Sequence, residues 1–233
     1  MNTRPPAASL EKIVRMTSDN PFQPFRDAYF TLSVVNLGGL PADEGAEVAI
    51  AGRSNAGKSS AINALAHRRQ LARTSKTPGR TQALNFFSLG DPDRSLVDLP
   101  GYGFSQVPWK LKQNWDRLIG GYLTRRRCLK GLVVVMDVRH PLTPLDRQLL
   151  EWFVPTQKPV HVLLTKADKL TRGAGALALV QARRELLRIT PGATVQLFSA
   201  LTHSGAEDAA RRIMAIINSD LPPADPAAGV ASA

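Results

Sequence analysis

Residues 52–59 spell GRSNAGKS, match the pattern GxxxxGK[ST] and leave little freedom in the choice of fold. An apolar, strand-like segment at residues 47–51 leads directly into this loop, and residues 59–69 are typical of a helix. In that setting the glycines allow backbone N–H groups to turn inward around an anion, and the start of the helix adds positive potential. Lys58 would carry charge to the β and γ phosphates of a nucleotide, and the Ser59 hydroxyl suits a magnesium ion. We interpret the segment as a phosphate-binding loop; the alternative is a purely structural glycine-rich turn.

Strand-like and helix-like segments alternate over most of the chain. We expect strands at residues 29–37, 47–51, 83–89, 95–98, 131–138, 160–165 and 194–199, and helices at 59–69, within 110–127, and at 144–153, 176–189 and 205–217. This alternation predicts an α/β fold with a mostly parallel six-stranded sheet and helices on both faces. Residues 29–37 are the candidate for an extra antiparallel edge strand. We assign residues 29–218 to one domain, residues 1–28 to a partly irregular extension and residues 219–233 to a flexible tail.

Composition excludes several classes of protein. The longest uninterrupted apolar run, residues 132–136, is far shorter than the ~18 residues that suggest a membrane span. Cys128 is the only cysteine, so we expect neither an intrachain disulfide nor a cysteine-rich metal site. Nothing resembling a signal peptide opens the chain, so we expect a cytoplasmic protein without a membrane partner. We also expect the protein to be a monomer. The 30 Lys and Arg against 19 Asp and Glu give a net charge of +11, which favours a polyanionic partner over the alternative of a generally basic surface.

Residues 98–101, DLPG, follow the strand expected at 95–98. There the Asp98 carboxylate can reach magnesium through water, and the Gly101 N–H can approach a γ-phosphate. Alone, the pattern is better explained by a strand-ending aspartate and a turn glycine. The phosphate-binding loop upstream favours the nucleotide interpretation.

Residues 165–168, TKAD, follow the strand expected at 160–165 and indicate the base. The Asp168 carboxylate can accept from both N1–H and the 2-amino group of guanine, whereas adenine would leave it unpaired. Lys166 can lay its methylene stem over the plane of the base. Backbone N–H groups in residues 198–200, FSA, could meet guanine O6, although a simple strand end is the alternative there. The pattern predicts GTP rather than ATP.

These elements, in this order, resemble a translation-factor-type GTPase, and further segments narrow the resemblance. The segments that carry it are GRSNAGKSS at 52–60, LARTSKTPGRTQ at 71–82, NFF at 85–87, DLPGYGF at 98–104, TKAD at 165–168 and FSA at 198–200. Together they look like the EngB family of bacterial ribosome-biogenesis GTPases, over about residues 29–218. The resemblance implies a P-loop GTPase fold, GTP binding and hydrolysis, and GDP as product. It also implies a partner in the large ribosomal subunit precursor and its ribosomal RNA, and a need for the protein in normal cell division and septation.

The resemblance also assigns the site residues. It makes Ser59 and Thr81 the magnesium ligands, although the sequence alone leaves Thr74, Thr77 and Thr81 as alternatives for the second hydroxyl. Lys58, Asn55, Thr81 and Gly101 are expected to contribute to hydrolysis. The nucleotide-binding residues would be Gly52, Arg53, Ser54, Asn55, Ala56, Gly57, Lys58, Ser59, Gly79, Arg80, Thr81, Gln82, Ala83, Asp98, Leu99, Pro100, Gly101, Thr165, Lys166, Ala167, Asp168, Phe198, Ser199 and Ala200.

Three positions bear on affinity and rate. Thr165 stands where asparagine is commoner, and threonine lacks the amide that would tether the base loop, residues 165–168, to the phosphate loop. We therefore expect this tether to be lost and the nucleotide affinity to be roughly micromolar or weaker. Tyr102 stands where many GTPases place the glutamine that orients water, so intrinsic hydrolysis should be slow. Asn55 leaves two hypotheses open: it helps to hold a potassium ion near the β and γ phosphates, or it only shapes the loop.

Basic residues gather in three groups: residues 67–80, residues 125–130 and residues 183–212. The first group lies in or beside the loop expected to sense the nucleotide, so ordering of that loop could change the face shown to RNA. A solvated charged face is the alternative. Two other functions remain open at this level: a metabolic P-loop kinase, against which the TKAD segment argues, and an RNA-binding protein that does not depend on nucleotide.

Overall fold

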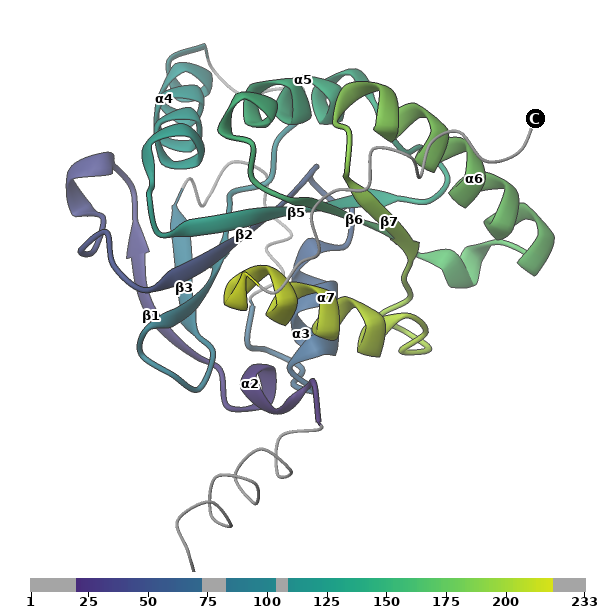
Figure 1. The fold of residues 1–233 in the computed structure, drawn as a ribbon, viewed down its shortest axis with the longest axis horizontal. Helices are drawn as coiled ribbons and strands as arrows, with labels where there is room; N and C mark the ends of the chain where they lie inside the picture. The colour runs from purple at the N-terminus through teal and green to yellow at the C-terminus, as the bar shows by residue number, and fades with distance from the viewer. Residues whose placement is uncertain (1–19, 73–82, 104–108, 220–233) are drawn as a thin grey trace, which may run out of the picture.

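The computed structural model describes residues 20–72, 83–103 and 109–219 of the chain, with side chains in the last range described from residue 117. Its centre is a seven-stranded sheet in the order β1-β3-β4-β2-β5-β6-β7 (Figure 1). The strands are β1 (Tyr29–Val34), β2 (Ala46–Gly52), β3 (Leu84–Ser88), β4 (Arg94–Asp98), β5 (Leu129–Asp137), β6 (Val160–Thr165) and β7 (Thr194–Leu197). Strands β4, β2, β5, β6 and β7 pair in parallel, whereas β3 runs antiparallel to both β4 and β1. The predicted six-stranded, mostly parallel sheet with an added antiparallel edge strand, β1, is confirmed.

Helices cover both faces of this sheet (Figure 1). They are α2 (Gln23–Arg26), α3 (Lys58–Leu65), α4 (Trp109–Arg125), α5 (Pro144–Phe153), α6 (Arg172–Ile189) and α7 (Ala206–Asn218). Helices α4, α5 and α6 lie on one face, and α2, α3 and α7 on the other. Each crossover between parallel strands therefore places a helix over one face of the sheet, and the next strand runs in the same direction as the one before it.

The side chains of the central strands point alternately into two hydrophobic cores, one on each face of the sheet. In β5, Leu132 and Val134 face the core beneath α4 and α5, whereas Val133 and Val135 face the core beneath α3 and α7. Successive side chains of a strand point to opposite faces, so a strand covered on both sides needs an unbroken apolar run. Full burial of each such side chain contributes about 1.5–3 kcal/mol to folding.

Two helix boundaries differ from the sequence-based expectation by four residues each. The helix expected over residues 59–69 ends at Leu65, and His67 has a left-handed φ of 51°, which cannot continue a right-handed helix. The helix expected over residues 176–189 begins at Arg172, because the Thr171 hydroxyl caps it by accepting from the Ala174 N–H at 3.3 Å.

The assigned extension and tail are described only in part. Within residues 20–28, Phe25 and Ala28 are buried against α3 and β3, so this stretch packs onto the domain. The rest of the extension, and the tail beyond Ser219, lie outside the described residues. Across the three described ranges, the helices that reach bilayer-spanning length are all too polar to cross a membrane.

Candidate nucleotide-binding site

The motifs singled out in the sequence meet at one edge of the sheet. Gly52 ends β2, Asp98 ends β4, Asp137 ends β5 and Thr165 ends β6. These four strands are parallel neighbours, so their carboxyl ends and the loops that follow them converge. A crevice outside the carboxyl ends of parallel strands is the usual ligand site of an open α/β sheet.

The phosphate-binding loop has the backbone that its glycines require. A Cβ at Gly52 would lie 2.7 Å from the Val135 carbonyl oxygen, so no larger residue fits where β2 leaves the sheet. Gly57 has φ +96° and precedes the first residue of α3, Lys58. This left-handed turn aims the loop amides and the helix N-terminus into the same concave space. Asn55 is also left-handed, with φ 63°, which asparagine tolerates better than most residues.

Lys58 and Asp98 form an ion pair across the site, with both side chains largely shielded from solvent. Asp98 lies opposite Ile50 of β2, which brings its carboxylate over the start of α3. The two charges expected to flank magnesium and the phosphates thus neutralise one another in this conformation. A bound nucleotide and its metal would compete with this ion pair for both charges.

The segment that follows β4, residues 99–102, lies against the phosphate loop. A Cβ at Gly101 would lie 3.4 Å from the Ser54 backbone nitrogen, and the Ser54 N–H donates to the Tyr102 carbonyl at 2.9 Å. Leu99 is buried in the core and supports this segment from behind. Gly101 is therefore placed where its amide can approach a terminal phosphate.

The available donors suit a magnesium ion that is shared with a nucleotide. Ser59 stands in the first turn of α3, and the Asp98 carboxylate reaches the same place. Hard oxygen ligands of this kind are those that magnesium prefers, with substrate phosphates and water completing its shell. Across residues 20–72, 83–103 and 109–219, no three His, Cys, Asp or Glu side chains gather as a metal cage. The second predicted ligand, Thr81, lies outside the described residues, as do Gly79, Arg80 and Gln82; Ala83 is described and is buried.

Thr165 ties the base loop to the phosphate loop, so the expected loss of this tether is wrong. Its hydroxyl lies 2.5 Å from the Ala56 carbonyl oxygen and 3.0 Å from the Met136 carbonyl oxygen, and is positioned to donate to either. The short side chain reaches because β6 ends directly beside the phosphate loop: a Cβ at Gly57 would lie 3.4 Å from the Thr165 hydroxyl oxygen. The expected weak affinity therefore loses its stated cause, and the affinity itself stays a prediction.

Lys166 provides a second tether between the base loop and the phosphate loop. The sequence analysis expected only that its methylene stem lies over the base. Its ammonium group donates to the Asn55 carbonyl at 2.7 Å and pairs with the Asp137 carboxylate at 2.9 Å. Asp137 in turn binds the Arg139 guanidinium at 2.7 Å, and hydrogen bonds from Arg139 and Lys166 hold the pKa of Asp137 far below its usual range. Asp137 and Arg139 were missed. The available signal was a carboxylate at the end of a buried strand, as for Asp98.

Asp168 is held ready for a base by Ser199. The Ser199 hydroxyl donates to the Asp168 carboxylate at 2.6 Å, and this bond lowers the pKa of Asp168. The acid is therefore ionised at neutral pH, as acceptance from two guanine N–H groups requires.

The last predicted segment, residues 198–200, has divided roles. Phe198 is fully buried, and its N–H donates to the Leu164 carbonyl, so Phe198 supports the pocket from the core rather than lining it. The Ser199 N–H donates to the Ser204 carbonyl at 2.9 Å, which occupies that amide. The Ala200 N–H is then the candidate donor to guanine O6, and Ala200 does line the groove.

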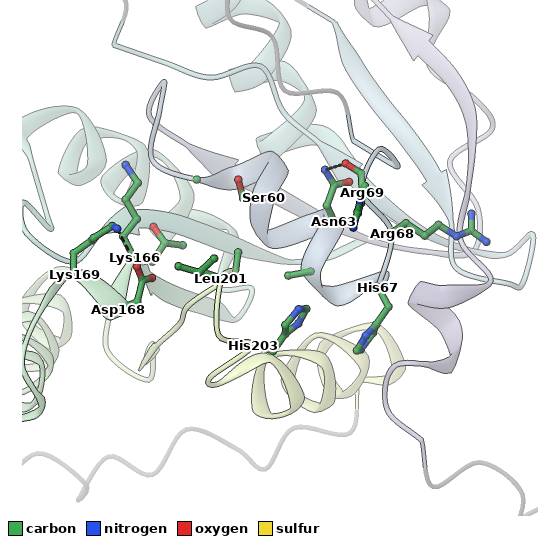
Figure 2. A pocket seen from close by; sticks show the side chains of 14 residues that line it. Ser60, Asn63, His67, Arg68, Arg69, Lys166, Asp168, Lys169, Leu201 and His203 are labelled. Carbon is green, nitrogen blue, oxygen red and sulfur yellow. Dashed lines mark hydrogen bonds and ion pairs between the residues drawn. The ribbon is translucent and has the colours of Figure 1, made fainter.

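A groove of about 680 Å³ runs from this base loop along α3 (Figure 2). Its near end is lined by Lys166, Asp168, Ala200 and Leu201, next to Gly57 at the phosphate loop. Leu201 is 74% exposed, a large apolar side chain on the wall of the groove, and suits the face of a purine. The sequence analysis overlooked Leu201, because its value depends on which way the loop turns.

Tyr102 occupies the position after Gly101 and turns into the protein. It is only 6% exposed, and its hydroxyl donates to the Asp146 carboxylate of α5 at 2.7 Å. Asp146 also accepts from the Thr143 N–H and hydroxyl, which caps α5. Burial, the Asp146 charge and their hydrogen bond raise the pKa of Tyr102, so the phenol stays protonated. A side chain so placed orients no attacking water.

Comparison with known proteins gives a consistent set of relatives. A sequence model of the family described as 50S ribosome-binding GTPase matches residues 47–166. The probable GTP-binding protein EngB of Aromatoleum aromaticum is 53% identical over 201 residues, covering 85% of this chain and 93% of that protein. The protein of the same description from Thiobacillus denitrificans is 58% identical over 187 residues, covering 80% and 89% of the two chains.

Solved structures agree on the fold. The crystal structure of a probable GTP-binding protein EngB aligns with a TM-score of 0.60 at 21% identity, over 75% of this chain and all of that one (100%). Era from Aquifex aeolicus aligns with a TM-score of 0.57 at 19% identity, over 78% of this chain and 58% of that one. The same fold is thus shared by proteins with little sequence in common.

Proposed function

The chain belongs to the EngB family of GTP-binding proteins and is a GTPase, and on that premise we propose that it acts as a nucleotide-dependent switch in assembly of the large ribosomal subunit. The observation that carries the proposal is the family match over residues 47–166, which spans both the phosphate loop and the first part of the base loop. The net charge of +11 supports a partner rich in phosphate. In the cell this role would lie in the cytoplasm and be required for normal division and septation, with the protein acting as a monomer.

The chain's residues divide the work of GTP hydrolysis. The loop amides of residues 52–59 would bind the phosphates, and Lys58 would leave Asp98 to neutralise the β and γ oxygens. The Gly101 N–H would hold the γ-phosphate while water attacks in line. A magnesium ion held by Ser59 and Thr81 would supply electrostatic stabilisation of the leaving oxygens.

We propose that turnover by the protein alone is slow and rises on the ribosomal precursor. The support is Tyr102, which fills the place of a water-orienting amide yet has its hydroxyl bound to Asp146. A missing orienting group is commonly supplied by a partner or an added cation.

Potassium is one candidate for that cation, held beside Asn55; the other hypothesis, that Asn55 only shapes the loop, is favoured by its left-handed backbone. Turnover measured in matched potassium and sodium buffers separates the two. Equal rates would remove the potassium hypothesis.

The test of the switch is sedimentation of the full chain with large-subunit precursors, in buffers with GDP or a non-hydrolysable GTP analogue. Enrichment only with the triphosphate form supports the proposal. The variant Asp168→Ala, which should lose guanine recognition, is the matched control and should not respond to the nucleotide. No co-migration of the wild-type chain in either state would refute the ribosomal role.

A further inference from the structure

Three aromatic rings from separate segments meet at the far end of the groove. His67, just after α3, stacks on His203, just before α7, with ring centroids 5.4 Å apart and planes 10° apart. Phe22, ahead of α2, meets His67 edge-on at 4.6 Å. Figure 2 shows the two imidazoles side by side between α3 and the loop that leads into α7. We refer to His67, His203 and Phe22 as the ring cluster.

The ring cluster is solvent-facing, and the nucleotide site does not account for it. His67 and His203 are both exposed, and both have left-handed backbones, with φ of 51° and 57°. Neither ring is needed by the base pocket, in which Asp168, Lys166 and Leu201 already offer the contacts for guanine. A pair of stacked, exposed rings beside the base pocket presents a flat π surface to a second ligand.

The charges around the cluster select an anion. Arg68 and Arg69 line the same end of the groove, and among the groove's lining residues the one carboxylate is Asp168, at the opposite end. Partial burial and the positive charges of Arg26 and His203 lower the pKa of His67, so at neutral pH its ring stacks as the neutral form. The cluster thus combines the uncharged ring of His67 with flanking guanidinium groups.

We propose that the ring cluster and Arg69 form a binding face for single-stranded RNA, on which an unpaired base stacks against His203 while the arginine meets a phosphate. Aromatic and imidazole rings next to arginine are the means by which proteins read unstacked bases. A duplex is disfavoured because its bases are already stacked and its grooves offer shape rather than ring faces. That the RNA is ribosomal rests on the proposed function; the chemistry of the face does not.

The test measures binding of a fluorescein-labelled, mixed-sequence 12-nucleotide single strand, and of a hairpin duplex of equal length, to the full chain saturated with GDP. The key variant is the double substitution His67→Asn and His203→Asn, since asparagine removes the rings but tolerates a left-handed backbone. Stacking is worth about 1–3 kcal/mol per base, so we expect affinity for the single strand to fall at least fivefold. The dependence on salt should stay close to that of the wild type, because Arg68 and Arg69 are kept.

Three further variants separate the contribution of the rings from that of charge. Arg69→Gln should make the slope of log affinity against log salt less negative by about 0.7, because one phosphate contact is lost. Arg184→Gln, an exposed arginine of α6 on the other face of the sheet, is the matched control and should change affinity less than twofold. His203→Tyr keeps a ring and should retain binding, and thermal unfolding of every variant checks that it is folded.

The inference is overturned if the double asparagine variant, folded and loaded with GDP, binds the single strand within twofold of the wild type, or if the wild type prefers the duplex. A variant that loses the precursor but keeps the single strand would instead identify the cluster as a protein contact, and would also overturn it. Nucleotide-dependent sedimentation that survives loss of the inference leaves the proposed function standing. Single-strand binding through the rings without any sedimentation refutes the proposed function alone.

Discussion

Replacing Thr165 by valine removes one hydroxyl group and keeps the shape of the side chain. In the wild type this hydroxyl is buried between two carbonyl oxygens, at 2.5 Å from Ala56 and 3.0 Å from Met136. Valine leaves these acceptors without the donor while opening no cavity. A buried polar group that loses its partner costs about 1–3 kcal/mol of folding free energy.

That cost predicts two measurable losses. For a domain of this size, 1 kcal/mol lowers the unfolding midpoint by about 2–4 °C, so Thr165→Val should melt about 2–12 °C lower. The Ala56 carbonyl belongs to the phosphate loop, so a freed loop should also bind GDP more weakly. If about 1–1.4 kcal/mol of the loss falls on binding, affinity drops about five- to tenfold.

The assay pairs calorimetric titration of GDP with thermal unfolding of the nucleotide-free chain. Thr165→Ser is the matched control, because it keeps the hydroxyl, and should bind GDP within about twofold of the wild type. Unchanged unfolding and unchanged GDP affinity for Thr165→Val would refute the tether. So would a serine variant as weak as the valine one.

Three further predictions address charge and pH. Asp98→Asn frees Lys58 from its ion pair, so binding of GDP in the absence of magnesium should tighten roughly tenfold, measured by titration in chelator. Ser199→Ala removes the hydroxyl donor that lowers the pKa of Asp168, so GDP affinity should fall about fivefold with guanine still preferred to adenine, measured by calorimetry. Burial lowers the pKa of His161 to about 4, against an ordinary value of 6.5. The unfolded chain therefore binds this proton first, and stability should fall by about 3 kcal/mol as pH drops from 6.5 to 4, measured by chemical unfolding across that window.

Each of these has an outcome that counts against it. Looser binding by Asp98→Asn in chelator would mean that the ion pair does not compete with phosphate for Lys58. A Ser199→Ala variant with wild-type affinity would show that Asp168 needs no second residue to hold it. The variant His161→Asn should lose its share of the acid sensitivity, and an unchanged pH profile would assign that sensitivity to other groups.

The sequence predicted the architecture because the apolar runs were long and the turns were marked. The run in β5 could be covered only on both faces, and the loop after β2 required a helix behind it. Boundaries were missed where one side chain or one backbone angle decided them. His67 ends α3 by turning left-handed, and Thr171 starts α6 by capping it, and neither residue type is a strong signal alone.

The site was predictable where a motif names its own chemistry and unpredictable where two segments must meet. The phosphate loop and Asp168 could be read directly. The contact between Thr165 and Ala56 could not be predicted, because it depends on where β6 ends relative to the phosphate loop that follows β2. The stacked His67 and His203 join parts of the chain more than a hundred residues apart, and their spacing carries no pattern.

The burial of Tyr102 ties the speed of this enzyme to the integrity of its fold. A glutamine or asparagine in its place could align a water molecule. It would also remove the buried aromatic ring and the hydrogen bond from the Tyr102 hydroxyl to the Asp146 carboxylate that caps α5. No single substitution there could quicken the reaction without loosening the framework around it. A faster intrinsic reaction by substitution at Tyr102 would therefore cost stability of the fold, which is consistent with the acceleration by a docking partner proposed above.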